Sequence, residues 1–335
     1  MSRGAPRGPS GVHVTPLLSV SPLAGVKGGR VIRVLLTGGS GMVGRNLRET
    51  APTDVELVAP SRGEVDLTDP EAVRRAFDAA APDFVIHAAG RVGGIAANMA
   101  DQAGFLVQNL RMGLAVLEAA YRGGIRCLNL ASSCIYPPKA PIPFSEDCLL
   151  TGALEPTNEG YALAKLSVVR LGQYLNQSAG AARIKSLIPC NLFGRHDNFD
   201  PLTSHLVPAA LRKVHEASRS GGDVLIWGDG SARREFLYAG DAARMIWHAC
   251  RHFEDLPELM NLGVGSDHSI LEYYEAAARV VGWQGRFRFD PSRPAGMQRK
   301  LVSIEWQRRL GFPAPRPLEE GLAETYRFFL ENHST

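Results

Sequence analysis

The segment SSCIYP, residues 132–137, follows an apolar run and ends on a proline. Serine hydroxyls at the end of a strand suit an enzyme that hydrogen-bonds a carbonyl oxygen. Cys134 is harder to place, because cysteine is among the most buried residue types and a single thiol beside a strand is usually packed. The segment therefore leaves two interpretations of Cys134: a core side chain, or a second reactive group beside Ser132.

Tyr161 and Lys165 stand four positions apart in a helical stretch, so their side chains share one face of the helix. An ammonium group beside a phenol favours the phenolate and eases proton transfer. With Ser132 they form a Ser–Tyr–Lys set. The Y-x-x-x-K spacing alone is common in amphipathic helices, and its specificity comes from the glycine-rich turn and the strand-end serine that precede it.

A glycine-rich turn, G-x-x-G-x-x-G, lies between a β-branched run and a helical stretch. Glycines permit a tight turn and let backbone N–H groups approach a pyrophosphate at the positive end of a helix. Alone the pattern also fits a plain turn, but inside a βαβ unit it predicts a dinucleotide site. The predicted contacts are Gly38, Gly41, Met42, Val43 and Gly44.

The choice of dinucleotide depends on the end of the second strand, where the chain reads APSRGEVDL, residues 59–67. An acidic residue there would bind the 2′-hydroxyl of NAD, whereas Ser61 and Arg62 suit the 2′-phosphate of NADP. A solvated loop arginine is the simpler alternative. Asp66 either contacts the adenine or caps the turn. We expect NADP(H) as the cofactor.

These side chains need a scaffold, and the chain alternates short apolar runs with helical stretches. Strands are predicted over 31–37, 55–59, 84–89, 127–133 and 184–194, and helices from residue 45 and over 70–80, 103–124 and 161–177. Such alternation is typical of right-handed βαβ units with a parallel sheet covered on both faces. Ligands then bind at the carboxyl ends of the strands.

The rhythm loosens after Gly194, where helices are predicted over 207–218, 270–282 and 318–331 and a strand over 223–230. The predicted fold class is therefore α/β: a doubly wound parallel-sheet Rossmann domain with a smaller α/β substrate-binding domain. We expect the first to cover residues 30–193. The second covers mainly 194–330 and is partly interleaved with the sheet.

Composition excludes several classes of protein. The formal charge of +3 gives no reason to expect a nucleic-acid partner, and no apolar run approaches the ~20 residues of a membrane span. Five cysteines without a C-x-x-C pair argue against a disulfide framework and a zinc site. We therefore expect no metal, and we expect a reduced, cytoplasmic enzyme. Residues 1–29 hold no acid and show no period, which predicts a disordered tail; a targeting presequence is the alternative.

Several segments carry a resemblance that runs from about Val31 to about Gly311: RVGGIAANM (91–99), SSCIYP (132–137), EPTNEGYALAK (155–165), NLFGRHDNF (191–199), SHLVPAALRK (204–213) and RREFLY (233–238). They resemble the extended short-chain dehydrogenase/reductases, and within them the GDP-4-keto-6-deoxy-D-mannose 3,5-epimerase-4-reductases. The resemblance implies inversion of C3 and C5 of a GDP-sugar, followed by NADPH-dependent reduction of C4 to give GDP-L-fucose.

The resemblance also assigns roles to positions. It implies that Ser132, Tyr161 and Lys165 carry out the reduction and that Cys134 and His205 exchange the protons at C3 and C5. It extends the cofactor site to Lys165, Pro189, Asn191 and His205. The implied substrate contacts are Lys213, Trp227, Arg234 and Lys300. Arg233 and Arg299 are as readily explained as solvated charge. Cys190 and Lys213 depart from the family pattern, which often has threonine and arginine there.

Other functions remain open at this stage. The protein could act on another nucleotide-linked 4-keto-6-deoxyhexose, or reduce C4 without inverting both centres. A redox-sensing regulator that binds NADP without turnover is a different class, although such proteins typically lack the tyrosine or the lysine. The resemblance further implies a homodimer that pairs the helices at 103–122 and 161–177 across a two-fold axis.

Overall fold

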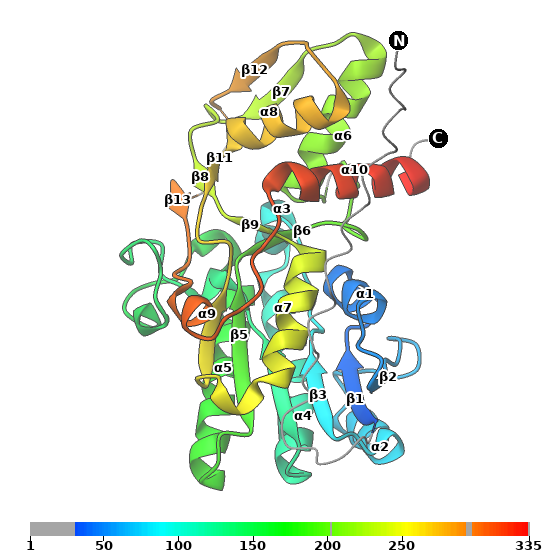
Figure 1. Ribbon diagram of the computed structural model, residues 1–335. Helices are drawn as coiled ribbons and strands as arrows, with labels where there is room; N and C mark the ends of the chain where they lie inside the picture. Colours follow the sequence, from blue (N-terminus) through cyan, green and yellow to red (C-terminus); the bar gives the residue numbers. More distant parts are fainter. Residues whose placement is uncertain (1–30, 202, 293–296, 334–335) are drawn as a thin grey trace, which may run out of the picture.

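The computed structural model describes residues 31–201, 203–292 and 297–333, and the predicted tail at residues 1–29 lies outside this range. Figure 1 shows one sheet with helices on both faces and, beyond the upper ends of its strands, a second group of helices and short strands. The predicted α/β class is confirmed, with a central sheet of six parallel strands.

The central sheet follows the doubly wound order. Its strands, from one edge to the other, are β2 (Val55–Val58), β1 (Ile32–Thr37), β3 (Phe84–His87), β4 (Arg126–Leu130), β5 (Ile184–Pro189) and β10 (Leu259–Leu262). Every neighbouring pair is parallel. The chain leaves β1 toward β2 on one side and returns to β3 on the other, so the strand order reverses between β1 and β3. Ligands of such sheets bind at this switch point.

Successive side chains of a strand pack on opposite faces of the sheet, in two hydrophobic cores. Val34 and Leu36 belong to one cluster with Trp247 of α7 (Ala239–Arg251), while Leu35 belongs to a second with Val116 of α4 (Gln102–Arg122). Both faces are thus buried, which explains the unbroken apolar runs of the strands. The helices of this part of the fold are α1 (Met42–Glu49), α2 (Pro70–Ala80), α3 (Ile95–Ala100), α4 (Gln102–Arg122), α5 (Glu159–Ala179) and α7 (Ala239–Arg251).

Local sequence signals set several of these helices. The Asp69 side chain accepts from the Glu71 N–H at the start of α2, with Pro70 in the first turn. Asp101 caps α4 in the same way through the Gly104 N–H. Gly113 lets α4 approach α5 closely, because a Cβ there would lie 2.2 Å from a Val168 methyl carbon.

The second group of elements has its own core, built on α6, α8 and α10. Its strands are β6 (Asn191–Phe193) with β9 (Phe236–Tyr238), β7 (Val224–Trp227) with β12 (Phe287–Asp290), and β8 (Arg233–Arg234) between β11 (His268–Ser269) and β13 (Arg299–Lys300). Its helices are α6 (Leu206–Ser220), α8 (Ile270–Val281) and α10 (Leu318–His333), whereas α9 (Glu305–Arg309) packs against β10 of the central sheet.

Two features differ from the sequence-based expectation. The predicted strand over 184–194 is two strands, because β5 ends at Pro189 and β6 then pairs with β9 outside the central sheet. The sixth strand, β10, was missed; it comes from the C-terminal half and closes the sheet beside β5. No helix of the described residues is long and apolar enough to cross a bilayer.

Candidate active site

The glycine turn connects β1 to α1 and leaves no room for side chains. Gly38 has φ +76°, and a Cβ there would lie 2.6 Å from the Ala89 nitrogen; one on Gly44 would lie 2.1 Å from the Gly38 oxygen. Gly41 is the N-cap of α1 and supplies no side-chain acceptor to its first turn, which contains Met42 and Val43. The turn is therefore a close-approach surface with free N–H groups at the positive end of a helix, which suits a pyrophosphate.

The turn after β2 contains two predicted cofactor contacts, Asp66 and Arg62, which differ in their surroundings. The Asp66 carboxylate accepts from the Thr68 backbone and hydroxyl at 2.9 and 2.8 Å, so it caps the turn. Glu64 likewise accepts from the Ser61 N–H at 2.7 Å. Arg62 is exposed, and within the described residues it has no hydrogen bond or ion pair. Its guanidinium is thus available to an anion beside the switch point.

The Ser–Tyr–Lys set lies at the carboxyl end of β4. Ser132 caps a short 3₁₀ turn (Ser133–Ile135), and its Oγ is 3.4 Å from the Cys134 N–H. The Ser132 side chain hydrogen-bonds both Tyr161 and Cys134. Lys165 is buried and donates to the Leu130 carbonyl at 2.9 Å. The structure thus brings hydroxyl, phenol, thiol and ammonium into one neighbourhood.

Burial controls the protonation of this neighbourhood. It raises the pKa of Tyr161, which the Ser132 hydrogen bond partly opposes, and it lowers the pKa of Lys165 to about 8. Burial also raises the pKa of the Cys134 thiol, against the Lys300 and Lys165 charges and the Ser132 hydrogen bond. It lowers the pKa of His205, and the Lys300 charge lowers it further. Near neutral pH the free protein therefore holds a thiol at Cys134 and a neutral imidazole at His205.

Lys300 connects these residues to the second group of elements. Its charge acts on both Cys134 and His205, so Lys300 lies within electrostatic reach of each of them. Lys300 is paired in register with Arg234 across β13 and β8. Two cations side by side at the thiol form a site that favours a polyanion.

The neighbouring arginines serve a different purpose. Arg233 and Arg299 both donate to the Asp267 carboxylate, which is 5 % exposed. They are neither free for a ligand nor merely solvated, because one buried acid holds both. Arg234 instead has its guanidinium on the Arg233 carbonyl at 2.8 Å, and burial lowers its pKa.

The remaining predicted substrate contacts, Lys213 and Trp227, lie together. The Lys213 ammonium is 5.5 Å from the centre of the Trp227 ring and donates to the Leu225 carbonyl at 3.0 Å. Trp227 is 53 % exposed, which leaves an indole face for a planar group. Of the two other predicted cofactor contacts, Pro189 ends β5 inside the core, and the Asn191 amide donates to the Glu235 carbonyl at 2.9 Å.

Sequence reasoning missed two polar residues of this region. Asn109 bonds the backbone of Arg91 in both directions, and a Cβ on Gly90 would lie 3.2 Å from its oxygen and 3.5 Å from the Lys165 nitrogen. Glu235 is 1 % exposed and accepts from the N–H groups of Val264, Gly265 and Val302. Neither residue belongs to a recognisable sequence motif, because the partners of both lie far away in the sequence.

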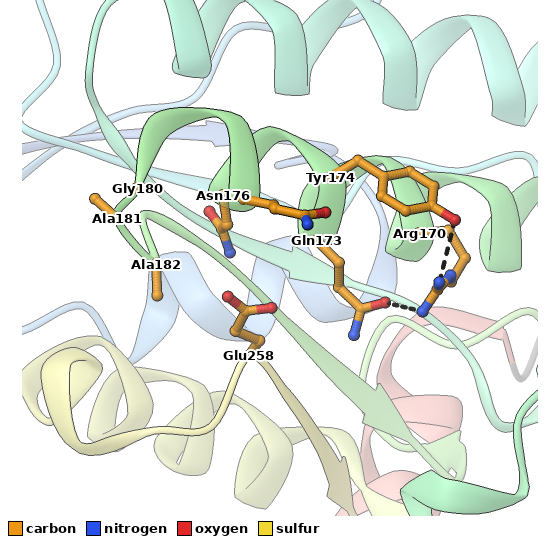
Figure 2. A pocket seen from close by; sticks show the side chains of 9 residues that line it. Arg170, Gln173, Tyr174, Asn176, Gly180, Ala181, Ala182 and Glu258 are labelled. Atoms are coloured by element: carbon orange, nitrogen blue, oxygen red, sulfur yellow. Dashed lines mark hydrogen bonds between the residues drawn. The ribbon is translucent and has the colours of Figure 1, made fainter.

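Two hollows of the described surface lie away from these residues. One, of about 500 Å³, is shown in Figure 2 and is lined by Arg170, Tyr174 and Glu258 among others. Ala182 stands two positions before β5 and Glu258 one position before β10, so this hollow lies at the amino ends of these strands, opposite the end that carries the Ser–Tyr–Lys set. The other, of about 620 Å³, is lined by residues 197–200, by α6 and by α10.

Known proteins match almost the whole chain. A GDP-L-fucose synthase of Azorhizobium caulinodans is 46 % identical over 305 residues, which cover 90 % of this chain and 97 % of the relative. A GDP-L-colitose synthase of Yersinia pseudotuberculosis is 43 % identical over 302 residues, covering 89 % and 98 %.

Solved structures agree with the sequence matches. A GDP-L-fucose synthetase from Naegleria fowleri bound to NADP superimposes with a TM-score of 0.83 at 28 % identity, covering 92 % of this chain and 97 % of that one. The model of the NAD dependent epimerase/dehydratase family matches residues 34–263, from β1 to just beyond β10. The chain therefore belongs to the NAD dependent epimerase/dehydratase family.

Proposed function

We propose that this protein is a GDP-L-fucose synthase, which inverts C3 and C5 of GDP-4-keto-6-deoxy-D-mannose and then reduces C4 with NADPH. The relatives named above support the substrate class. The observation that carries the proposal is Cys134 beside the Ser–Tyr–Lys set, together with Lys300, whose charge acts on both Cys134 and His205. A C4 reductase alone would need no thiol and imidazole there.

The epimerisation follows from the acidity of carbons next to a ketone. Loss of the C3 or C5 proton gives an enolate, and inversion needs a base on one face and an acid on the other. The neutral His205 imidazole is ready to accept a proton, and the Cys134 thiol is ready to donate one. Ser132 and Tyr161 hydrogen-bond the C4 oxygen as negative charge develops on it.

The reduction uses the same oxygen site and must come second, because it removes the ketone that acidifies C3 and C5. Tyr161 donates the proton to the C4 oxygen. The Lys165 ammonium nearby stabilises the phenolate that Tyr161 becomes, and with a pKa of about 8 it is largely protonated at neutral pH.

The residues present fit NADP(H). The backbone of the glycine turn would hold the pyrophosphate, and Arg62 would bind the 2′-phosphate. Bound NADPH supplies the hydride for C4. We assign Lys165, Pro189, Asn191 and His205 to the same site, as the resemblance implies, and Asp66 lies in the turn next to Arg62.

The GDP moiety would bind on the second group of elements. Arg234 and Lys300, side by side in register, suit the diphosphate, and the Lys213–Trp227 pair offers a flat face to the base. We accordingly assign residues 30–193 to cofactor binding and 194–330 mainly to substrate binding. We also propose a cytoplasmic homodimer, since all five cysteines are free and α4 and α5 share an exposed, partly apolar face.

A second candidate is an epimerase/reductase for another GDP-linked 4-keto-6-deoxyhexose. The relative named for a different sugar, colitose, favours it, because its identity of 43 % is close to that of the fucose enzymes. The catalytic groups would be the same, and only sugar contacts would differ.

One assay tests the proposal and separates the two candidates. The purified protein is given NADPH and GDP-4-keto-6-deoxy-D-mannose, NADPH oxidation is followed by absorbance, and the product is identified by NMR, with Tyr161→Phe as the control. We expect stoichiometric oxidation and GDP-L-fucose. A product with C3 or C5 uninverted, or turnover only with a different keto-sugar, would refute the first candidate.

A further inference from the structure

The loop between β6 and α6, residues 194–205 without the undescribed residue 202, carries His205 and is called here the His205 loop. Residues at its start form hydrogen bonds with α1. That helix begins at the glycine turn. The loop therefore connects the proposed cofactor site with one of the two proposed proton-transfer groups.

Three contacts make this connection. Asn46 of α1 is 2 % exposed, and its amide donates to the Arg195 carbonyl at 3.1 Å. Glu49, at the end of α1, lies 2.6 Å from the Nε2 of His196 and 3.5 Å from the guanidinium of Arg195. Two consecutive loop residues are thus fixed to consecutive turns of one helix.

His196 is the most constrained of these residues. Its φ is +67°, a conformation that non-glycine residues rarely adopt. Its ring packs edge-on against Phe328 at 4.7 Å between centroids, and its side chain is only 12 % exposed. Contacts of the side chain must offset this backbone strain, and the Glu49 hydrogen bond is the shortest of them.

Further hydrogen bonds hold the other described residues of the loop. Asp200 accepts from the backbone and hydroxyl of Thr203 at 3.0 Å, and the Asn198 amide donates to that hydroxyl at 2.8 Å. Arg212 of α6 donates to the Phe199 carbonyl at 2.9 Å. The loop ends at His205, the N-cap residue of α6.

We propose that Glu49 and His196 are positioning residues that couple the cofactor site to the epimerisation step. Binding of the dinucleotide at the first turn of α1 fixes the helix, and the Glu49–His196 hydrogen bond passes this to the loop that sets the place of His205. Proton exchange at C3 and C5 is then fastest when the cofactor needed for the next step is already bound. This inference rests on the proposed function.

The test measures deuterium incorporation at C3 and C5 of GDP-4-keto-6-deoxy-D-mannose in D₂O by mass spectrometry, with and without saturating NADP⁺. The oxidised cofactor occupies the site without reducing the ketone. Couplings between sites are typically fivefold or more, so we expect NADP⁺ to raise wild-type exchange by about that factor. Glu49→Ala should abolish the rise, and Glu49→Gln, which still reaches the imidazole, should restore part of it.

Two further variants separate positioning from folding. His196→Asn removes the ring but tolerates positive φ, so it should match Glu49→Ala while still unfolding in one cooperative transition, at a melting temperature lowered only by the lost contact with Phe328. Glu56→Ala breaks an exposed ion pair with Arg33 far from the loop and should behave as wild type. Amide hydrogen exchange supplies a readout without substrate: NADP⁺ should protect residues 195–201 in wild type and not in Glu49→Ala.

The outcomes are distinct. Wild-type exchange that ignores NADP⁺, or a rise that survives in Glu49→Ala, would overturn the coupling. Absence of exchange in wild type under every condition would overturn the proposed function and the coupling with it.

Discussion

At the scale of residues, the same burial that makes Cys134 look like a packed side chain also prepares it for chemistry. Burial raises the pKa of the thiol and lowers the pKa of His205, while the Lys300 charge opposes the first shift and adds to the second. The two groups are therefore held in complementary neutral states. The proposed epimerisation needs this combination of a proton donor and a proton acceptor.

The two reactions should separate by mutation. Cys134→Ser keeps the size but replaces the thiol by a much weaker acid, so deuterium entry at C3 and C5 should fall by about 10²–10⁴-fold, with reduction of the uninverted ketone still possible. Tyr161→Phe should abolish hydride transfer and retain some exchange. Both are followed in D₂O with and without NADPH. Wild-type exchange in Cys134→Ser would show that the cysteine is only packed.

Cofactor preference should depend on Arg62. Its guanidinium makes no hydrogen bond or ion pair within the described residues and acts on Asp66 only through its charge, so Arg62→Ala should remove a charged contact to the 2′-phosphate and little else. We expect NADPH binding to weaken about ten- to a hundredfold, or ~1.5–3 kcal/mol, with NADH binding nearly unchanged. Titration with both cofactors measures this, and equal losses for the two would contradict the assignment.

Asp197 should make stability depend on pH. One oxygen accepts from the Asn198 N–H at 2.7 Å. Burial of the carboxyl group raises the pKa of Asp197 to about 7, against the hydrogen bonds from the backbone of Asn198 and Gly194. An unfolded aspartate has a pKa of ~3.9, so the folded protein holds a proton that the unfolded chain has lost, and stability falls as the pH rises from about 4 to 7.

Asp197→Asn removes this titration. Its gain in unfolding free energy over wild type should be about 1–3 kcal/mol larger at pH 8 than at pH 5. Urea denaturation at the two pH values measures it, with exposed Asp147→Asn as the control. A gain independent of pH would mean that Asp197 is ionised in the folded protein.

At the scale of elements, α4 and α5 pack against each other, and both also expose apolar side chains on their outward faces. Their outward faces expose Val107 (43 %), Tyr121 (38 %), Leu163 (39 %) and Tyr174 (55 %), an unusual number of large apolar groups for helices that face water. The same faces are the ones that the family resemblance pairs across a two-fold axis. The hollow of Figure 2, with Arg170 and Tyr174, lies at one end of this surface.

A charge in that surface should break the proposed dimer. Val107→Glu would place an unpaired carboxylate in each copy of a symmetric interface, so the dissociation constant should rise on the order of a hundredfold or more. Light scattering at micromolar concentration should report a dimer for wild type and for the control Val31→Glu, and a monomer for Val107→Glu. A wild-type monomer would refute the assembly itself.

At the scale of the whole molecule, the described part of the chain has three core clusters, and the first strand of the sheet begins at Ile32. The amino-terminal stretch shows no apolar period that could cover a further face. The chemistry of the proposed site likewise draws on residues from Gly38 onward.

Deletion of residues 1–29 should therefore leave turnover and thermal stability unchanged within error, because nothing in that stretch can bury a core face. Melting temperature and NADPH oxidation of the full-length and truncated proteins are the measurements. A large loss of either would mean that the tail docks on the folded part or covers the site.

The sequence predicted the local elements, namely strands, helices and turns, but it did not predict which distant residues pair with one another. The alternation of apolar runs and helical stretches predicted five of the six strands of the sheet, and the glycine turn and the Tyr161–Lys165 spacing were recognisable, because each depends on neighbours a few positions away. Tertiary structure alone decided that β5 ends at Pro189, that Asp267 holds Arg233 and Arg299, and that the Lys300 charge acts on both Cys134 and His205. The physical reason is that strand register, desolvation and charge pairing depend on residues brought together from far along the chain, and no local period records them.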